Sequence, residues 1–131
     1  IEFITIASTG DATDFGDLTV PRMVGGSCSN STRGVIGGGD PQPGTQTNVI
    51  DYVTIASTGD AADFGDLTSA RRDVDAASSP TRAIFVGGDT PTLVNTIDYV
   101  EILTTGDAVD FGDQTTKRDR LSACSNGHGG L

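Results

Sequence analysis

The chain has 131 residues, a formal net charge of −10 and a pI near 4.1. This length predicts one domain at most, and the acidic charge argues against nucleic acid or an anionic membrane surface as a partner, because both require a basic face. No apolar run approaches the roughly 18 residues of a membrane span, and no signal peptide is visible. The chain begins at Ile1 rather than Met, so we expect a processed product or a piece of a longer protein.

The composition indicates β-structure. Sixteen of the 18 acidic residues are Asp, and another 18 residues are Gly. Both residue types have low helix propensity and are common in turns. We therefore expect an all-β protein built of many short strands.

The chain opens with two segments that return twice. Residues 1–6 alternate as an extended strand does, and because both faces carry apolar side chains, this strand should lie between two neighbours. Residues 9–17 are the second repeated segment, and its last four residues, 14–17, predict the next strand. This strand has one structural aromatic residue in each copy, namely Phe15, Phe64 and Phe111. The two segments recur at 50–55 and 58–66, and again at 97–102 and 105–113.

Two further strands lie between these copies. The first consists of small residues and is followed by a tight turn, of which Asn126-Gly127 is the strongest hairpin signal. The second ends in a pair of glycines, and a variable loop, 40–48 or 89–95, leads to the next copy. The expected first strands are 26–29, 76–78 and 122–125, and the expected second strands are 33–36 and 82–86.

Four short strands in a period of 49 and then 47 residues (Ile1 to Ile50, Ile50 to Ile97) are typical of a β-propeller blade. The chain holds about three such blades. We expect the two half blades at its ends to complement each other, so that two copies close a six-bladed ring, a C2 dimer joined by shared blades. The alternative is that the 131 residues are a segment of a longer chain. The expected units are a half blade at 1–19 (third and fourth strands), full blades at 20–67 and 69–114, and a half blade at 117–131 (first and second strands).

The order of these elements resembles the kelch repeat. In one copy the resemblance is carried by Gly38-Gly39, Asp51-Tyr52, Phe64 and Arg71, with Phe where kelch repeats usually have Trp. The amino-acid sequence of residues 50–68 resembles kelch-like repeats in virion structural proteins of marine tailed phages. The resemblance covers nearly the whole chain and implies a kelch-like propeller in a phage particle. It says little about the ligand, because propellers host many unrelated functions.

Three Asp residues recur in every copy. Calcium prefers carboxylate oxygens, so one interpretation is a calcium site in each blade. Residues three apart in a strand point to opposite faces, however, and the other interpretation is that these residues cap turns beside a nearby Arg. The nine positions are Asp11, Asp14, Asp17, Asp60, Asp63, Asp66, Asp107, Asp110 and Asp113.

One Arg also recurs in each copy, as Arg22, Arg71 and Arg118. These side chains can brace neighbouring blades through bidentate bonds to carbonyls and carboxylates, or together form an anion site. Architecture repeats, whereas binding sites usually break the symmetry, so we favour bracing. The cysteines, Cys28 and Cys124, hold equivalent positions two blades apart, too far for a disulfide. We expect both thiols to be buried.

The two variable loops differ in length and sequence while the strands around them repeat. Loops on a rigid scaffold are where recognition usually resides, and the alternative is drift in an unconstrained linker. The candidate binding residues are Asp40, Gln42, Thr45, Gln46 and Asn48 in one loop and Asp89, Thr92 and Asn95 in the other.

The single histidine, His128, leaves no Ser-His-Asp set, so we expect neither an enzyme nor a cofactor. The expected function is that of a structural or recognition propeller in a phage tail, fibre or capsid decoration, located in the virion or outside the cell. The expected partners are a second copy, other virion proteins or a host glycan. The alternatives are a bacterial secreted or cell-surface adhesion or glycan-binding propeller, calcium-dependent in one version, and a propeller glycosidase or lyase.

Overall fold

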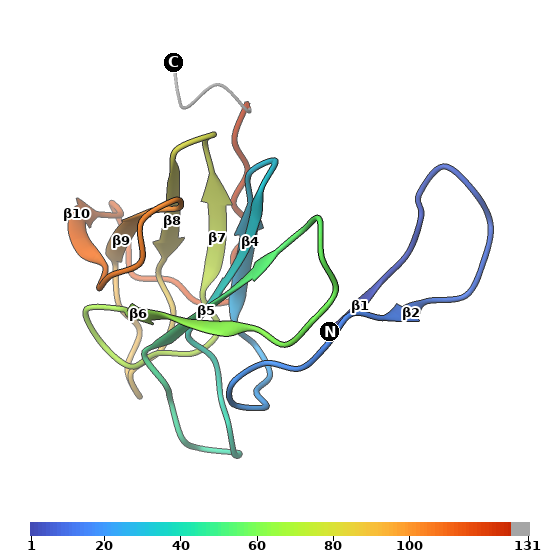
Figure 1. Cartoon of the computed structure of the whole chain (residues 1–131). Helices are drawn as coiled ribbons and strands as arrows, with labels where there is room; N and C mark the ends of the chain where they lie inside the picture. Colours follow the sequence, from blue (N-terminus) through green and yellow to red (C-terminus); the bar gives the residue numbers. More distant parts are fainter. Residues whose placement is uncertain (127–131) are drawn as a thin grey trace.

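In the computed structural model, which describes residues 1–126, the chain folds into antiparallel β-strands joined by turns and loops (Figure 1). These residues contain no helix, so the prediction of an all-β protein is confirmed for them. The strands form a two-stranded sheet, β1–β2, and two four-stranded sheets, β3–β4–β5–β6 and β7–β8–β9–β10. Their bounds are β1 (Glu2–Phe3), β2 (Thr13–Asp14), β3 (Gly26–Ser29), β4 (Arg33–Gly37), β5 (Val49–Thr54), β6 (Ala62–Asp66), β7 (Asp75–Ser78), β8 (Arg82–Val86), β9 (Thr96–Glu101) and β10 (Val109–Asp113).

The two four-stranded sheets are built alike because their sequences repeat. Val35 of β4 pairs with Cys28 of β3 and with Tyr52 of β5. The outermost strand of each sheet carries a bulge at Phe64 or Phe111, directly before a glycine with positive φ, Gly65 (144°) or Gly112 (137°). A bulge leaves one residue out of the ladder and bends the strand. The second sheet repeats the first register with Ile84, Ala77 and Tyr99.

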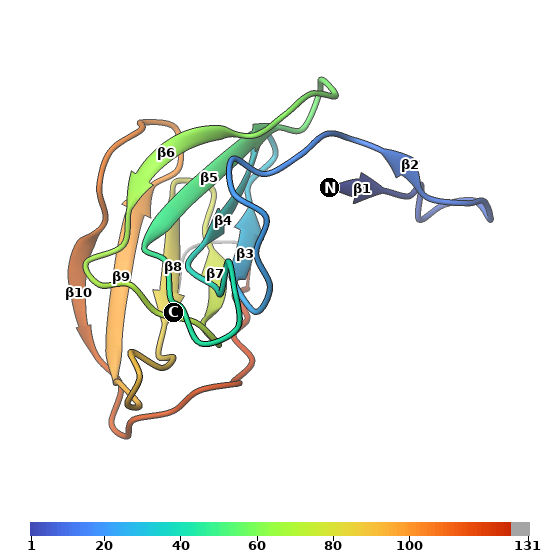
Figure 2. The same ribbon diagram turned by 90° about the horizontal axis from the view of Figure 1, so that it is seen from below.

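The hydrophobic core lies between the two four-stranded sheets, which fan out side by side (Figure 2). Phe85 of β8 approaches β4 so closely that a Cβ on Gly37 would lie 2.6 Å from its ring. Each large apolar side chain buried in this core contributes on the order of 1.5–3 kcal/mol. The core consists of Val35, Ile50, Phe64, Leu67, Ala76, Ala83, Phe85, Val100 and Ile102.

Residues 1–17 form a two-stranded hairpin, here called the N-terminal hairpin, which projects away from the larger sheets (Figures 1 and 2). Its register places Glu2 opposite Asp14 and Phe3 opposite Thr13, as in the equivalent part of β5 and β6. In the described part of the chain, β1 has a neighbour on one side only. The expectation that residues 1–6 form a strand between two neighbours is therefore wrong within the described residues. No sheet packs on the side chains of this segment either, and Ile6, which follows β1, is 94% accessible to solvent.

The expected strand at 122–125 is not formed. The segment nevertheless keeps a repeated contact, since Ser125 Oγ donates to the carbonyl of Ser78 as Ser78 Oγ donates to that of Ser29. A strand needs a backbone neighbour to complete its ladder. The turn at Asn126-Gly127 and the strand expected after it, including His128, lie wholly or partly outside the described residues.

The connection into that segment also repeats. Val24, Asp73 and Arg120 hold equivalent positions, and all three adopt a left-handed φ of 53°, 53° and 49°. The amide of Asp73 donates to the carbonyl of Val24 at 2.8 Å, and the amide of Arg120 donates to that of Asp73 at 3.1 Å. Consecutive units are therefore joined in the same way at each step.

Residues 1–126 form an open stack with the N-terminal hairpin at one end and β10 at the other (Figures 1 and 2). They do not close a ring, so the propeller and its number of blades stay predictions. Over the same residues, no helix has the length and the apolar character that crossing a membrane requires.

Candidate functional site

Two of the three repeated Arg side chains form buried ion pairs. Arg22 Nη2 lies 2.8 Å from Asp51 Oδ2, and Arg71 Nη2 lies 2.9 Å from Asp98 Oδ2, with all four side chains shielded from solvent. Each guanidinium also donates to a carbonyl of the neighbouring strand, that of Ile36 in the first pair and that of Phe85 in the second. These two Arg side chains are thus engaged inside the fold and present no open anion site.

Burial and pairing act against each other on these guanidinium groups. Burial lowers the pKa of Arg71, and the negative charge of Asp98 opposes that shift. Burial likewise lowers the pKa of Arg22, with Asp51 opposing it. A buried pair of this kind is weak evidence for stability, but removing one partner leaves an uncompensated charge in the interior.

The third repeated Arg stands apart from the other two. Arg118 is exposed, and its guanidinium has no hydrogen-bond or ion-pair partner among residues 1–126. The same holds for the hydroxyl of Thr115. The equivalent hydroxyls of Thr19 and Thr68 donate to Asp51 and Asp98, at 2.6 and 2.7 Å.

The recurring Asp residues fill different roles rather than converging. Asp60 Oδ1 accepts the amide of Asp17 at 2.9 Å, and Asp107 Oδ1 accepts that of Asp66 at 3.1 Å, so the first Asp of each block caps the preceding unit. Asp110 accepts the amide of Gly112 within its own turn. Asp11, Asp14, Asp63 and Asp113 are exposed at the unit edges. Among the described residues, no three His, Cys, Asp or Glu side chains are placed to share a metal ion.

A non-repeated residue, Arg72, ties the two variable loops together. Its Nη1 lies 3.1 Å from Asp40 Oδ2, and its Nη2 lies 3.4 Å from Asp89 Oδ2. Asp40 and Asp89 are the first residues of the two loops, so both loops leave their sheets at the same end. The equivalents of Arg72 are Met23 and Asp119, which explains why a search for repeated residues misses it.

Asp40 also orders its own loop. Its carboxylate accepts the amides of Gly44 and Thr45, at 3.2 and 3.1 Å. Desolvation raises the pKa of Asp40, but the bonds from Arg72 and from these two amides outweigh it and hold the pKa below its ordinary value. The carboxylate is therefore a fixed structural anion of the loop end.

The eight candidate binding residues divide by exposure. Gln42, Thr45 and Thr92 are exposed at the loop tips, whereas Asp40 and Asp89 are held by Arg72. The remaining three, Gln46, Asn48 and Asn95, are half-buried. The loop tips also expose Pro43, Gly44, Pro91 and Leu93, which complete the candidate contact surface.

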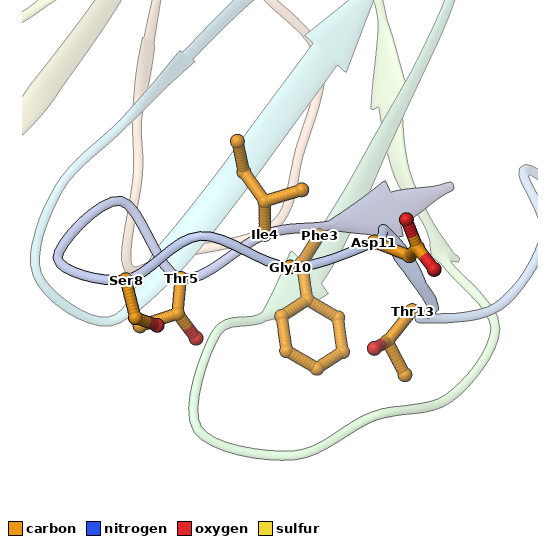
Figure 3. A pocket seen from close by; sticks show the side chains of 7 residues that line it. All are labelled: Phe3, Ile4, Thr5, Ser8, Gly10, Asp11 and Thr13. Atoms are coloured by element: carbon orange, nitrogen blue, oxygen red, sulfur yellow. The ribbon is translucent and has the colours of Figure 1, made fainter.

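A small hollow lies on the N-terminal hairpin. Figure 3 shows the ring of Phe3 and the hydroxyl of Thr13 on one side of the hairpin and Ile4 on the other. The Phe3 ring meets Phe15 edge-on, with centroids 6.1 Å apart, as Tyr52 meets Phe64. All residues that line this hollow belong to the N-terminal hairpin.

Both cysteines are free, but their surroundings differ. Cys28 is half-buried, and desolvation raises its pKa to about 11. Cys124 is exposed, so the prediction that both thiols are buried is wrong for it. The reason is that 122–125 forms no strand and has no sheet to shield it in the described structure.

Comparison with protein-family models and with curated proteins finds no match for this chain. The kelch-like resemblance and the relation to phage proteins therefore stay expectations drawn from the repeated residues.

Proposed function

We propose that this protein is a non-enzymatic structural and recognition module of a phage particle, which presents its two variable loops to a partner. The proposal rests on a difference between the repeated residues and the loop residues. The paired Arg and Asp side chains are engaged within the fold, in the same way from one unit to the next. The loops differ between units and leave polar groups exposed at their tips.

The loops are held before any partner arrives. Arg72 ties their first residues, Asp40 orders the first loop, and Asp89 bridges to Leu93 in the second. A preorganised loop loses little conformational freedom on binding, which favours affinity. Rigid sheets carrying two ordered loops suit recognition rather than chemistry.

The exposed groups indicate the chemistry of the partner. Gln42 and Thr92 offer uncharged donors and acceptors, and the apolar Leu93 follows Thr92 in the second loop, whereas the Thr45 hydroxyl is bonded within the first loop. This combination suits the hydroxyls and ring faces of a host glycan or a polar protein surface in the particle. The net charge of −10 keeps the chain away from packaged nucleic acid.

Two experiments test this function. Immunogold labelling of purified phage particles should find the antigen, and its absence from particles contradicts the virion assignment. Binding of the labelled chain to host cells or to a glycan panel should fall at least tenfold in the double variant Gln42→Ala, Thr92→Ala. The matched control is Thr105→Ala, an exposed residue of another loop. Unchanged binding by the double variant, or hydrolysis of a panel glycan, would refute the proposal.

A further inference from the structure

Consecutive repeat units, that is the N-terminal hairpin and the two four-stranded sheets in chain order, contact each other through the same backbone hydrogen bonds. The amide of Gly59 donates to the carbonyl of Phe15 at 2.7 Å, and the amide of Ala61 donates to that of Asp17 at 2.8 Å. The next pair of units repeats both bonds at 2.7 Å, from Gly106 to Phe64 and from Ala108 to Asp66. Two independent copies make this contact a property of the repeat.

The side chains at this contact repeat as well. In the first copy, Asp51 receives the guanidinium of Arg22 and the hydroxyl of Thr19, and Asp60 caps the amide of Asp17. In each case the Thr and the Arg follow the outermost strand of one unit, and the Asp residues that receive them belong to the next. The second copy repeats these bonds with Asp98, Arg71, Thr68, Asp107 and Asp66.

Among residues 1–126, a third contact surface of this kind has no neighbouring unit beside β10. Phe111 is 56% exposed, whereas its equivalent Phe64 is 2% exposed. A Cβ on Gly112 would meet nothing within 4 Å, whereas a Cβ on Gly65 would lie 2.4 Å from the carbonyl oxygen of Gly106. We call Phe111, Gly112, Asp113, Thr115 and Arg118 the open edge.

The N-terminal hairpin carries the residues that fill this role in the other units. Glu2 stands at the position of Asp51 and Asp98, and it has no ion-pair partner in the described structure. Ile6 stands at the position of Ile55, which is 45% exposed, and of Ile102, which is fully buried. Gly10 and Ala12 stand at the positions of the amide donors Gly59 and Ala61, and Asp11 stands at the position of the capping residue Asp60.

We propose that the N-terminal hairpin of one copy docks on the open edge of a second copy, with Glu2 paired to Arg118. Glu2 accepts from Thr115 as well, and Asp11 caps the amide of Asp113. The carboxylate of Glu2 and the guanidinium of Arg118 carry opposite charges. Glu2 is one methylene longer than the Asp at this position in the other units, so its carboxylate reaches further from the backbone. Within the 131-residue chain the two surfaces lie at opposite ends of the stack, so the hairpin that docks on the edge is that of a second copy (Figures 1 and 2).

Such a contact is head-to-tail, so it builds either a closed ring or an open filament. Each chain holds three hairpins of the repeated kind, at 1–17, 49–66 and 96–113. Two chains closing on each other give a ring of six. The expected species is then twice 13.4 kDa, about 27 kDa. This inference does not depend on what the loops bind, so its failure leaves the proposed function untouched.

The charges of the pair provide the test. Native mass spectrometry of the 131-residue chain should show the 27 kDa species, and Arg118→Glu or Glu2→Arg alone should reduce it at least tenfold. The double variant, with the charges exchanged, should restore it. Lys117→Glu is the matched control, because it makes the same charge change at an exposed neighbouring position, and it should leave the dimer unchanged.

A mixture of the two single variants gives a second test. In a dimer of one chain of each kind, the native hairpin meets the native edge at one contact. At the other contact the two substituted residues meet, with their charges exchanged. Both contacts therefore pair opposite charges, and the equimolar mixture should recover the two-chain species.

Several results would contradict the docked hairpin. A wild-type chain that stays at 13.4 kDa at tens of micromolar overturns the proposal, as do single variants that still dimerise. Single variants that dissociate, with rescue neither in the double variant nor in the mixture, overturn the pairing of Glu2 with Arg118. Circular dichroism of each variant confirms that it has folded.

Discussion

Arg71 Nη2 and Asp98 Oδ2 lie 2.9 Å apart with both side chains completely removed from solvent. Arg71 reaches Asp98 from the segment that connects the two four-stranded sheets, and it also donates to the carbonyl of Phe85. The pair thereby fastens the entry of one sheet to its own third strand. Its equivalent, Arg22 with Asp51, does the same one unit earlier.

Loss of one partner of this pair should be costly. We expect Asp98→Asn to destabilise the chain by about 3–5 kcal/mol, because it leaves the Arg71 charge buried without compensation. The exposed pair of Arg82 with Glu101, 2.6 Å apart, is the control, and Glu101→Gln, the matching change of a carboxylate to an amide, should cost at most about 1 kcal/mol. Urea unfolding followed by circular dichroism measures both. Equal losses in the two variants would contradict the distinction.

The glycines of the outermost strands offer a matched comparison. Gly65 and Gly112 share a positive φ, so Ala should strain the backbone at both. Only at Gly65 would the new Cβ also meet the backbone of the next unit. We expect Gly65→Ala to cost at least about 1–3 kcal/mol more than Gly112→Ala in the free energy of unfolding of the monomeric Arg118→Glu background. Equal losses in the free energy of unfolding for the two variants would show that the neighbouring unit moves to accommodate the added Cβ without a measurable cost.

The two cysteines should react at different rates. Burial raises the pKa of Cys28 to about 11, so at pH 8 about one thiol in a thousand is ionised. Cys124 is exposed and should be alkylated by iodoacetamide much faster. Mass spectrometry of peptides over time reports both rates, and in urea they should converge. The labelling of Cys28 should accelerate as the pH rises towards 11, and rapid labelling at pH 8 would refute its shielding.

Arg72 should link loop order to pH. The pKa of Asp40 is lower in the folded chain than its ordinary value of 3.8, so its contribution to stability is present above that pH. The contribution is lost as the pH falls below 3.8 and through the folded pKa. Arg72→Ala should flatten this part of the acid unfolding curve and speed amide exchange at Gly44 and Thr45. An unchanged curve together with unchanged exchange would show that Arg72 does not hold the loops.

Much of the fold could be predicted from the sequence because its signals are local. Alternating apolar residues place the strand at 49–54, and the glycine pair after β4 places the loop that follows. The spacing of the copies identifies Arg22 and Arg71 as equivalent, and the structure gives them equivalent partners. Repetition therefore identified equivalent residues, but equivalent residues act alike only where a neighbouring unit supplies the partner, as Arg118 shows among residues 1–126.

The partners themselves were decided by the tertiary structure. Asp60 caps an amide 43 residues earlier in the chain, and the alternation of a strand carries no information about a neighbouring unit. Arg72 gained its role because two sheets bring Asp40 and Asp89 to one end, although no repeated pattern marks it. Cys124 is exposed because a strand forms only where a neighbour completes its hydrogen bonds. The sequence by itself determined the period and the strands of the two four-stranded sheets, but not the extent of β1 or the absence of a strand at 122–125. Packing between sheets determined which polar groups meet, because those meetings depend on relative placement in space.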